Sequence, residues 1–151
     1  IDAVGIQAHW QLNSPSLEEI EKSIIAYHNL GVKVMFTELD VSPLPNPWEL
    51  VGAGVEQDFK KLEGDPTMNP YPVELPEDIQ IKLADRYENI FKLFLKHKDK
   101  ISRVTFWGLT DKHSWLNNFP IRGRTNYPLL FDRNYQPKKA YKRILKIDSL
   151  H

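Results

Sequence analysis

The chain has 151 residues, a length that suits one domain, and its 41% hydrophobic and 26% charged residues give the balance of a globular protein. Its 20 basic and 20 acidic side chains cancel, so composition provides no basic excess for a nucleic-acid partner. No stretch is long and apolar enough for a membrane span, and the absence of cysteine excludes disulfides and thiolate metal sites.

The first third of the chain predicts a strand, a helix and a second strand. Residues 3–9 form a short, mostly apolar segment typical of a buried strand. Ser16-Leu17-Glu18-Glu19 has the pattern of a capping box, and Gly31 stands where the following helix would end. Residues 32–41 predict a second strand, whose apolar start is typical of parallel strands covered on both faces.

The remainder alternates in the same way but has longer loops. Residues 42–76 hold seven of the eleven prolines, and a connection of this length is expected to be functional. A helix is predicted over 77–98, a third strand over 103–108, and a last helix from Pro137 to about Leu150. The second long loop, 109–132, separates this last strand and helix.

This order, with expanded loops only after strands, predicts an α/β protein of the (β/α)₈ TIM-barrel type. A closed barrel needs eight strands and about 250 residues, so the chain is expected to be one piece of a larger catalytic barrel. It also opens without an initiator Met and leads almost at once into a predicted buried strand. An open doubly wound sheet is the alternative, weakened by the lack of a Gly-rich phosphate loop after the first strand.

The strongest functional signal is Phe36-Thr37-Glu38-Leu39-Asp40-Val41, at the end of the second strand. Side chains alternate along a strand, so Glu38 and Asp40 are predicted to share one side. Because both come from one strand, they cannot easily flank a sugar, and a second catalytic carboxylate should come from another strand. The alternative is a pair of acids that caps the next loop.

Gln7 and His9 end the first strand and are predicted to share a face. If the first two strands are neighbours, His9 can hydrogen-bond both Glu38 and Asp40, orient Glu38 and help keep it ionised. A structural histidine is the alternative. His9, Glu38, Asp40 and His113 could also be drawn as metal ligands, but no helix has a His-x-x-x-His spacing, so neither a metal nor another cofactor is predicted.

Two tryptophans, Trp107 and Trp115, lie near the end of the third strand. Their flat faces suit stacking on pyranose rings, although packing within the loop is an alternative for either one alone. Several potential hydrogen-bond donors lie nearby in the sequence: Asn117, Asn118, Arg122, Arg124 and Asn126.

Three motifs together resemble one family. Gly-x-Gln-x-His-Trp, Thr-Glu-Leu-Asp and Phe-Trp-Gly-x-x-Asp-x-x-Ser-Trp match, in order, the sixth, seventh and eighth strands of glycoside hydrolase family 10 xylanases. The resemblance extends over nearly the whole chain, through residues 128–132 and 138–141. It implies that residues 1–151 are the C-terminal three β/α units of a barrel that cleaves xylan internally with retention of anomeric configuration.

The resemblance also implies a role for each candidate residue. Glu38 would be the nucleophile, His9 would hydrogen-bond it, and Asp40 would complete the trio. The implied substrate-binding residues are Gln7, Trp107, Trp115 and Arg122. The 42–76 loop is longer than a minimal loop of the family, and we expect it to shape the leaving-group side of the cleft, for instance through Trp48. Export from the cell is expected because xylan is too large to enter intact.

One family feature is absent from the sequence. The family's acid/base glutamate lies in an Asn-Glu pair at the fourth strand, whereas the nearest pair here, Glu88-Asn89, is reversed and mid-helix. The implied partners are therefore xylan and an N-terminal part of the same barrel. Alternatives are another retaining glycosidase such as a mannanase or cellulase, a non-catalytic carbohydrate-binding barrel, and an α/β protein whose motifs serve packing alone.

Overall fold

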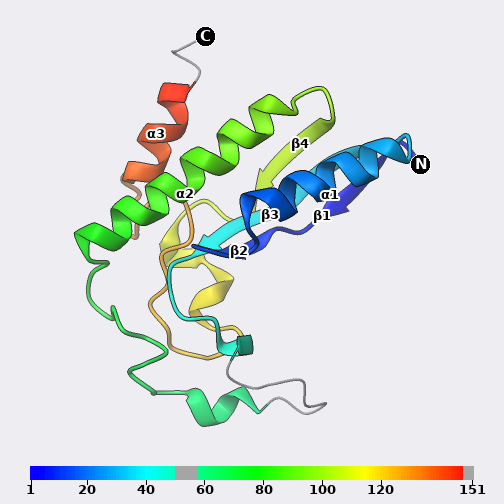
Figure 1. Cartoon of the computed structure of the whole chain (residues 1–151). Coiled ribbons are helices and arrows are strands. Elements are labelled where there is room, and N and C mark those ends of the chain that lie inside the picture. The colour runs from blue at the N-terminus through cyan, green and yellow to red at the C-terminus, as the bar shows by residue number, and fades with distance from the viewer. Residues whose placement is uncertain (50–57, 148–151) are drawn as a thin grey trace.

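The computed structural model describes residues 1–49 and 58–147. Its main elements are β1 (Ala3–Ile6), β2 (His9–Gln11), α1 (Leu17–Asn29), β3 (Lys33–Ser42), α2 (Glu77–Lys96), β4 (Ile101–Phe106) and α3 (Lys139–Ile147) (Figure 1). Short 3-10 helices occupy the two long loops. Residues 50–57 of the predicted 42–76 loop and 148–150 of the predicted last helix lie outside the described residues.

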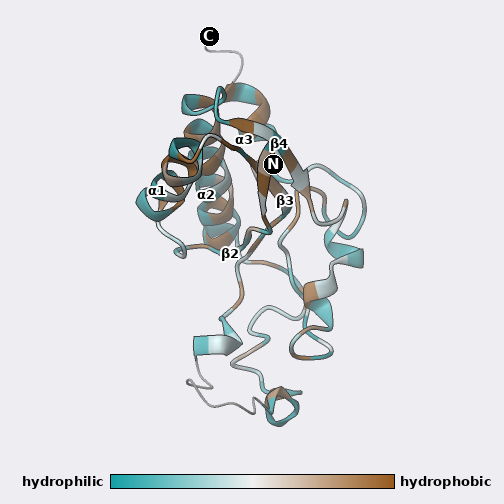
Figure 2. Ribbon diagram, turned by 90° about the vertical axis from the view of Figure 1, so that its right-hand side faces the viewer, coloured by the Kyte–Doolittle hydropathy of each residue, from teal (hydrophilic) through white to brown (hydrophobic). Residues whose placement is uncertain are grey.

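β3 is the central strand of a parallel sheet. It pairs with β1 and then β2 along one edge, and with β4 along the other. α1 and α2 cover one face of β3, where Ile24 and Phe94 pack on Phe36 in the main hydrophobic core. Consecutive parallel strands with helices on one face form the wall of a barrel, whereas a doubly wound sheet carries helices on both faces. The long loops gather at the carboxyl end of the strands (Figure 2).

The first predicted strand is interrupted. β1 ends at Ile6 and β2 begins at His9, because Ala8 adopts a left-handed backbone conformation with φ of 71°. The chain nevertheless stays paired with β3: the N–H of Glu38 donates to the Gln7 carbonyl at 2.9 Å, and that of Asp40 donates to Ala8 at 3.2 Å. An apolar pattern does not reveal a positive φ at alanine, which is uncommon.

β3 contains a bulge directly beside the candidate carboxylates. Phe36 pairs with Val104 and Leu39 with Phe106, so two residues of β3 stand opposite one residue of β4. Phe36 and Leu39 are both fully buried in the core although they are three positions apart. Bulges re-aim side chains, and this one places Thr37 and Glu38 between two core-facing residues.

The helices begin largely as predicted. The capping box of α1 is confirmed: Ser16 Oγ accepts from the Glu19 N–H at 3.2 Å, and the Ser16 N–H donates to Glu19 at 2.7 Å. α3 starts at Lys139 rather than Pro137, because Pro137 pairs with Phe131 in an isolated bridge. No helix in the described ranges is long and apolar enough to cross a membrane.

Candidate active site

A histidine between two carboxylates forms the centre of the site. His9, at the start of β2, faces the end of β3, where His9 Nε2 lies 3.0 Å from Glu38 Oε2 and His9 Nδ1 lies 3.0 Å from Asp40 Oδ1. The prediction that Glu38 and Asp40 point to one side is confirmed, as is the approach of His9 to both. Parallel pairing of His9 with Asp40 produces this arrangement, because it brings two strand ends into register.

Asp40 is the fixed member of this cluster. Its side chain is fully buried, and its second oxygen, Oδ2, accepts the indole N–H of Trp115 at 2.9 Å. Both oxygens are therefore occupied, which compensates for the burial of a charge. Asp40 thus orients His9 and Trp115 and has no free face for a ligand.

Glu38 is the open member of the cluster. Its side chain keeps 21% of its surface exposed, against 1% for Asp40. Oε2 accepts the His9 hydrogen bond, while the carboxylate as a whole remains reachable from the carboxyl end of the sheet. A positioned, partly exposed carboxylate can act as a nucleophile or as a base.

The charge state of His9 follows from its two partners. Burial lowers the pKa of His9, but the hydrogen bonds and negative charges of Asp40 and Glu38 outweigh that effect and leave the pKa above its ordinary value. An imidazole that faces two carboxylates through both nitrogens has to donate twice, which requires the protonated ring.

Aromatic rings form one wall of the site. The ring centroid of Trp115 lies 4.7 Å from that of His9, and Trp107 contacts His9 edge-on at 6.5 Å. Trp107 is 46% exposed. Phe119, which the sequence patterns did not single out, stacks on Trp115 at 5.0 Å and continues this wall. An exposed aromatic two residues into a loop gives no distinct sequence signal.

The other two predicted binding residues, Gln7 and Arg122, lie outside the aromatic wall. Gln7 is exposed at the break between β1 and β2, next to the cluster, and its carbonyl accepts from Glu38. Arg122 is exposed and lines a groove together with Phe119 and Phe59. Trp48 is also exposed and contacts Phe59 rather than the cluster. The binding roles of Gln7 and Arg122 remain predictions.

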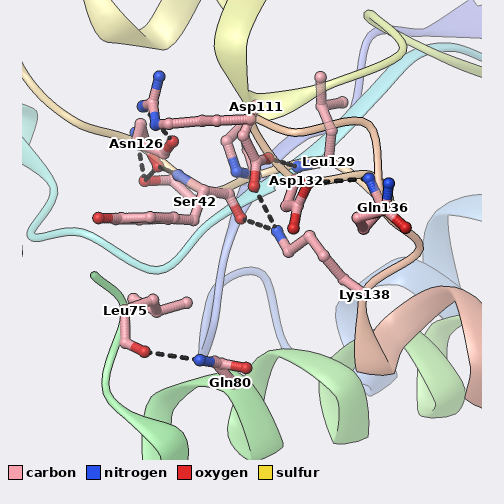
Figure 3. Close-up of polar contacts among 12 residues, drawn as sticks. Ser42, Leu75, Gln80, Asp111, Asn126, Leu129, Asp132, Gln136 and Lys138 are labelled. Carbon is pink, nitrogen blue, oxygen red and sulfur yellow. Dashed lines mark hydrogen bonds and ion pairs between the residues drawn. The ribbon is translucent and has the colours of Figure 1, made fainter. Parts of the chain in front are cut away.

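A largely buried polar network supports the loop that carries the tryptophans (Figure 3). Asp111 accepts from Lys138 at 2.8 Å and from the Leu129 N–H at 2.8 Å, while Lys138 also donates to the Tyr127 carbonyl. Burial raises the pKa of Asp111 and lowers the pKa of Lys138. This ion pair ties the loop after β4 to the start of α3.

Further hydrogen bonds join the loop after β4 to the end of β3 and to the loop that follows β3. Asn126 donates to Ser42 Oγ at 3.0 Å, and its N–H donates to Asn117 at 2.9 Å. Arg124 donates to the Met68 and Pro45 carbonyls at 2.8 Å each, which fastens one long loop to the other. These contacts tie the loop after β4 to the end of β3 and to the loop that follows it.

The conceivable metal ligands were also compared within the ranges that the structure covers. No group of three or more His, Asp or Glu side chains there has the geometry to hold a metal ion. His113, one of the conceivable ligands, instead contacts Tyr135.

Comparison with known proteins identifies relatives of nearly the whole chain. The family model of glycosyl hydrolase family 10 matches residues 1–147. Endo-1,4-beta-xylanase A of Xylanibacter ruminicola is 47% identical over 147 residues, which cover 97% of this chain and 39% of that protein. The chain therefore spans about two fifths of the length of this relative.

Solved structures agree with this relationship. A GH10 endoxylanase from a sugarcane soil metagenome is 50% identical and superposes with a TM-score of 0.85, over 97% of this chain and 40% of that one. A mutant structure in complex with xylotriose is 36% identical, with a TM-score of 0.75, over 96% of this chain and 39% of that one. The fold described above is thus shared with part of the domain in each.

Proposed function

The chain belongs to glycosyl hydrolase family 10, and from this membership we propose that it forms the C-terminal three β/α units of a retaining endo-β-1,4-xylanase with Glu38 as the nucleophile. The observation that carries the proposal is the His9 bridge, which fixes Glu38 to buried Asp40 while Glu38 stays partly exposed. The relatives named above as xylanases, and the separate mutant structure in complex with xylotriose, support xylan as the substrate.

The reaction follows from this geometry. Glu38 Oε2 is engaged by His9, so Oε1 attacks the anomeric carbon. The bond to the leaving oxygen breaks as a general acid protonates that oxygen, and a glycosyl ester on Glu38 results. Water then attacks the same carbon, gives its proton to the former acid, and releases Glu38 as a carboxylate.

The general acid has to come from elsewhere in the barrel. Retaining enzymes hold their two carboxyl groups about 5–5.5 Å apart on either side of the bond. Asp40 cannot serve as this second carboxyl group, because it is buried and both of its oxygens accept hydrogen bonds. We therefore assign the acid to an N-terminal part of the same barrel, and propose export as the route to a polymeric substrate.

The experiment is xylan hydrolysis by a complete barrel that contains this chain. In what we call the grafted barrel, residues 1–147 replace the aligned segment of the soil-metagenome endoxylanase. Release of reducing ends from xylan is expected, and Glu38→Gln should lower kcat by on the order of 10⁴-fold or more, because the amide cannot form the ester. A second graft, into the Xylanibacter ruminicola protein, gives an independent background.

Matched assays separate the alternatives. Glu88→Gln, a glutamate on α2 that contacts Lys92, is the control for loss of one carboxylate. Mannan and carboxymethylcellulose as substrates test the mannanase and cellulase alternatives. Folded grafted barrels that bind xylan without cleaving it would contradict the proposal and favour a carbohydrate-binding role.

A further inference from the structure

Gly108 marks a point of close packing directly after Trp107. Its backbone φ is +134°, a conformation that residues with a side chain rarely adopt. A Cβ atom at Gly108 would lie 2.9 Å from Cδ1 of Leu129, which is closer than packed carbon atoms normally approach. The bend that carries Trp107 therefore packs directly against the side chain of Leu129.

Leu129 is itself fixed from several directions. Its side chain is fully buried, and its N–H donates to Asp111 Oδ1 at 2.8 Å (Figure 3). The carbonyl of the preceding residue, Pro128, accepts from the N–H of Val41 at 3.3 Å and from the hydroxyl of Tyr87. Because these bonds anchor the backbone next to a buried side chain, Leu129 presents a rigid surface to the bend after β4.

The other side of Trp107 is anchored to the strand of the candidate nucleophile. The N–H of Trp107 donates at 3.1 Å to the carbonyl of Leu39, the residue after Glu38. The indole contacts His9 edge-on, with ring centroids 6.5 Å apart, yet Trp107 remains 46% exposed. Since so exposed a ring is held by few contacts of its own, its position depends on the backbone at Gly108.

We propose that Leu129 is a positioning residue for xylan cleavage, and that it acts through Gly108 by fixing where the indole of Trp107 lies beside His9. The inference rests on the proposed function, in which Trp107 lines the sugar site. A shift of this ring would displace the sugar from Glu38, and a misplacement of about 1 Å can lower a rate by about a hundredfold. Leu129 is buried and does not itself reach the substrate.

The test is a double-mutant cycle in the grafted barrel. Leu129→Ala removes the methyl group that faces Gly108 and is expected to lower kcat/KM on xylan about tenfold, because the indole is no longer held in place. In a Trp107→Ala background, the same change should lower kcat/KM less than about twofold, because the residue through which Leu129 acts is gone. Leu129→Met keeps the side-chain volume and should stay within about twofold of the parent.

A second buried leucine is the matched control. Leu83, on α2, is 1% exposed like Leu129, so Leu83→Ala removes comparable packing and should leave kcat/KM unchanged. Equal losses from Leu129→Ala with and without Trp107, or an equal loss from Leu83→Ala, would show that Leu129 only stabilises the fold. If Leu129→Ala does not fold, Leu129→Val takes its place in the cycle, with an expected loss of about threefold.

Fluorine NMR separates failure of this inference from failure of the proposed function. The grafted barrel is produced with fluorotryptophan, and the resonance that disappears in Trp107→Phe belongs to Trp107. Leu129→Ala should shift or broaden this resonance, whereas Leu83→Ala should not. An unchanged resonance in Leu129→Ala would overturn the inference even in a barrel that cleaves xylan. A shifted resonance in a barrel that does not cleave xylan would instead overturn the proposed function and leave the placement of Trp107 by Leu129 standing.

Discussion

In the part of the chain that the structure describes, two clusters pair a buried carboxylate with a nitrogen base, and their difference shows what distinguishes a candidate reactive site from a structural one. In the His9–Glu38–Asp40 cluster, the histidine and Glu38 each keep 21% of their side-chain surface exposed. In the Asp111–Lys138 pair, the corresponding values are 1% and 13%. Neighbouring carboxylates raise the pKa of His9, whereas burial lowers that of Lys138. Glu38 is exposed enough to reach a substrate, whereas the more deeply buried Asp111–Lys138 pair, which we call the sealed pair, stabilises the fold.

The largest expected effect on stability is at the sealed pair. Lys138→Met leaves Asp111 buried without its counter-charge, so the free energy of unfolding of the grafted barrel should fall by about 3 kcal/mol or more. Urea unfolding measures this change. Lys82→Met, which removes an exposed pair with Asp78, is the control and should cost at most about 0.5 kcal/mol. Loss of kcat in Lys138→Met at unchanged stability would show that this pair serves the chemistry.

A smaller effect is expected where the aromatic wall joins the open cluster. Trp115→Phe keeps an aromatic ring but removes the N–H that donates to Asp40 Oδ2. Because hydrogen bonds to charged groups contribute most, kcat on xylan should fall roughly tenfold. Trp10→Phe, in the core against Phe36, is the matched substitution that leaves Asp40 untouched. Equal losses of kcat in both variants would mean that packing, not orientation of Asp40, is responsible.

The smallest effect is a pH dependence of stability from His9. Its raised pKa means that the folded protein binds the proton more tightly than the unfolded chain does. This stabilisation is fully present below about pH 6.5, the ordinary pKa, and is lost as the pH rises through the higher pKa of the folded state. The difference in unfolding free energy between the grafted barrel and its His9→Gln variant should therefore be largest below pH 6.5.

Urea unfolding at several pH values tests this dependence. A parallel series with His28→Gln, which removes an exposed imidazole on α1, gives the baseline. A difference for His9→Gln that grows as the pH rises would show that His9 is neutral in the folded protein, and would contradict the ionised cluster.

The strand and helix order could be predicted because local signals coincide with it. The capping box at Ser16 starts α1, and the apolar run before Glu38 marks β3. The meeting of His9 with Glu38 and Asp40 could also be predicted, since parallel strands end at one edge of a sheet. Membership of the family followed from three motifs at those same strand ends.

The features that could not be predicted depend on contacts between distant residues. The break at Ala8 and the bulge in β3 arise from the pairing of whole strands, and no local sequence pattern indicates either one. The two long loops are fastened by Arg124, whose partners lie more than fifty residues away. The stacking of Phe119 on Trp115 depends on that same loop geometry.

The most direct test of the central claim is chemical trapping of the nucleophile. The grafted barrel is incubated with a 2-deoxy-2-fluoro-xylobioside that carries a good leaving group, because the fluorine slows hydrolysis of the glycosyl ester by destabilising its oxocarbenium-like transition state. Peptide mass spectrometry then locates the label. The account predicts a xylobiosyl ester on Glu38 in every labelled molecule. A label on another residue, or an unlabelled protein that cleaves xylan with inversion of configuration, would contradict it.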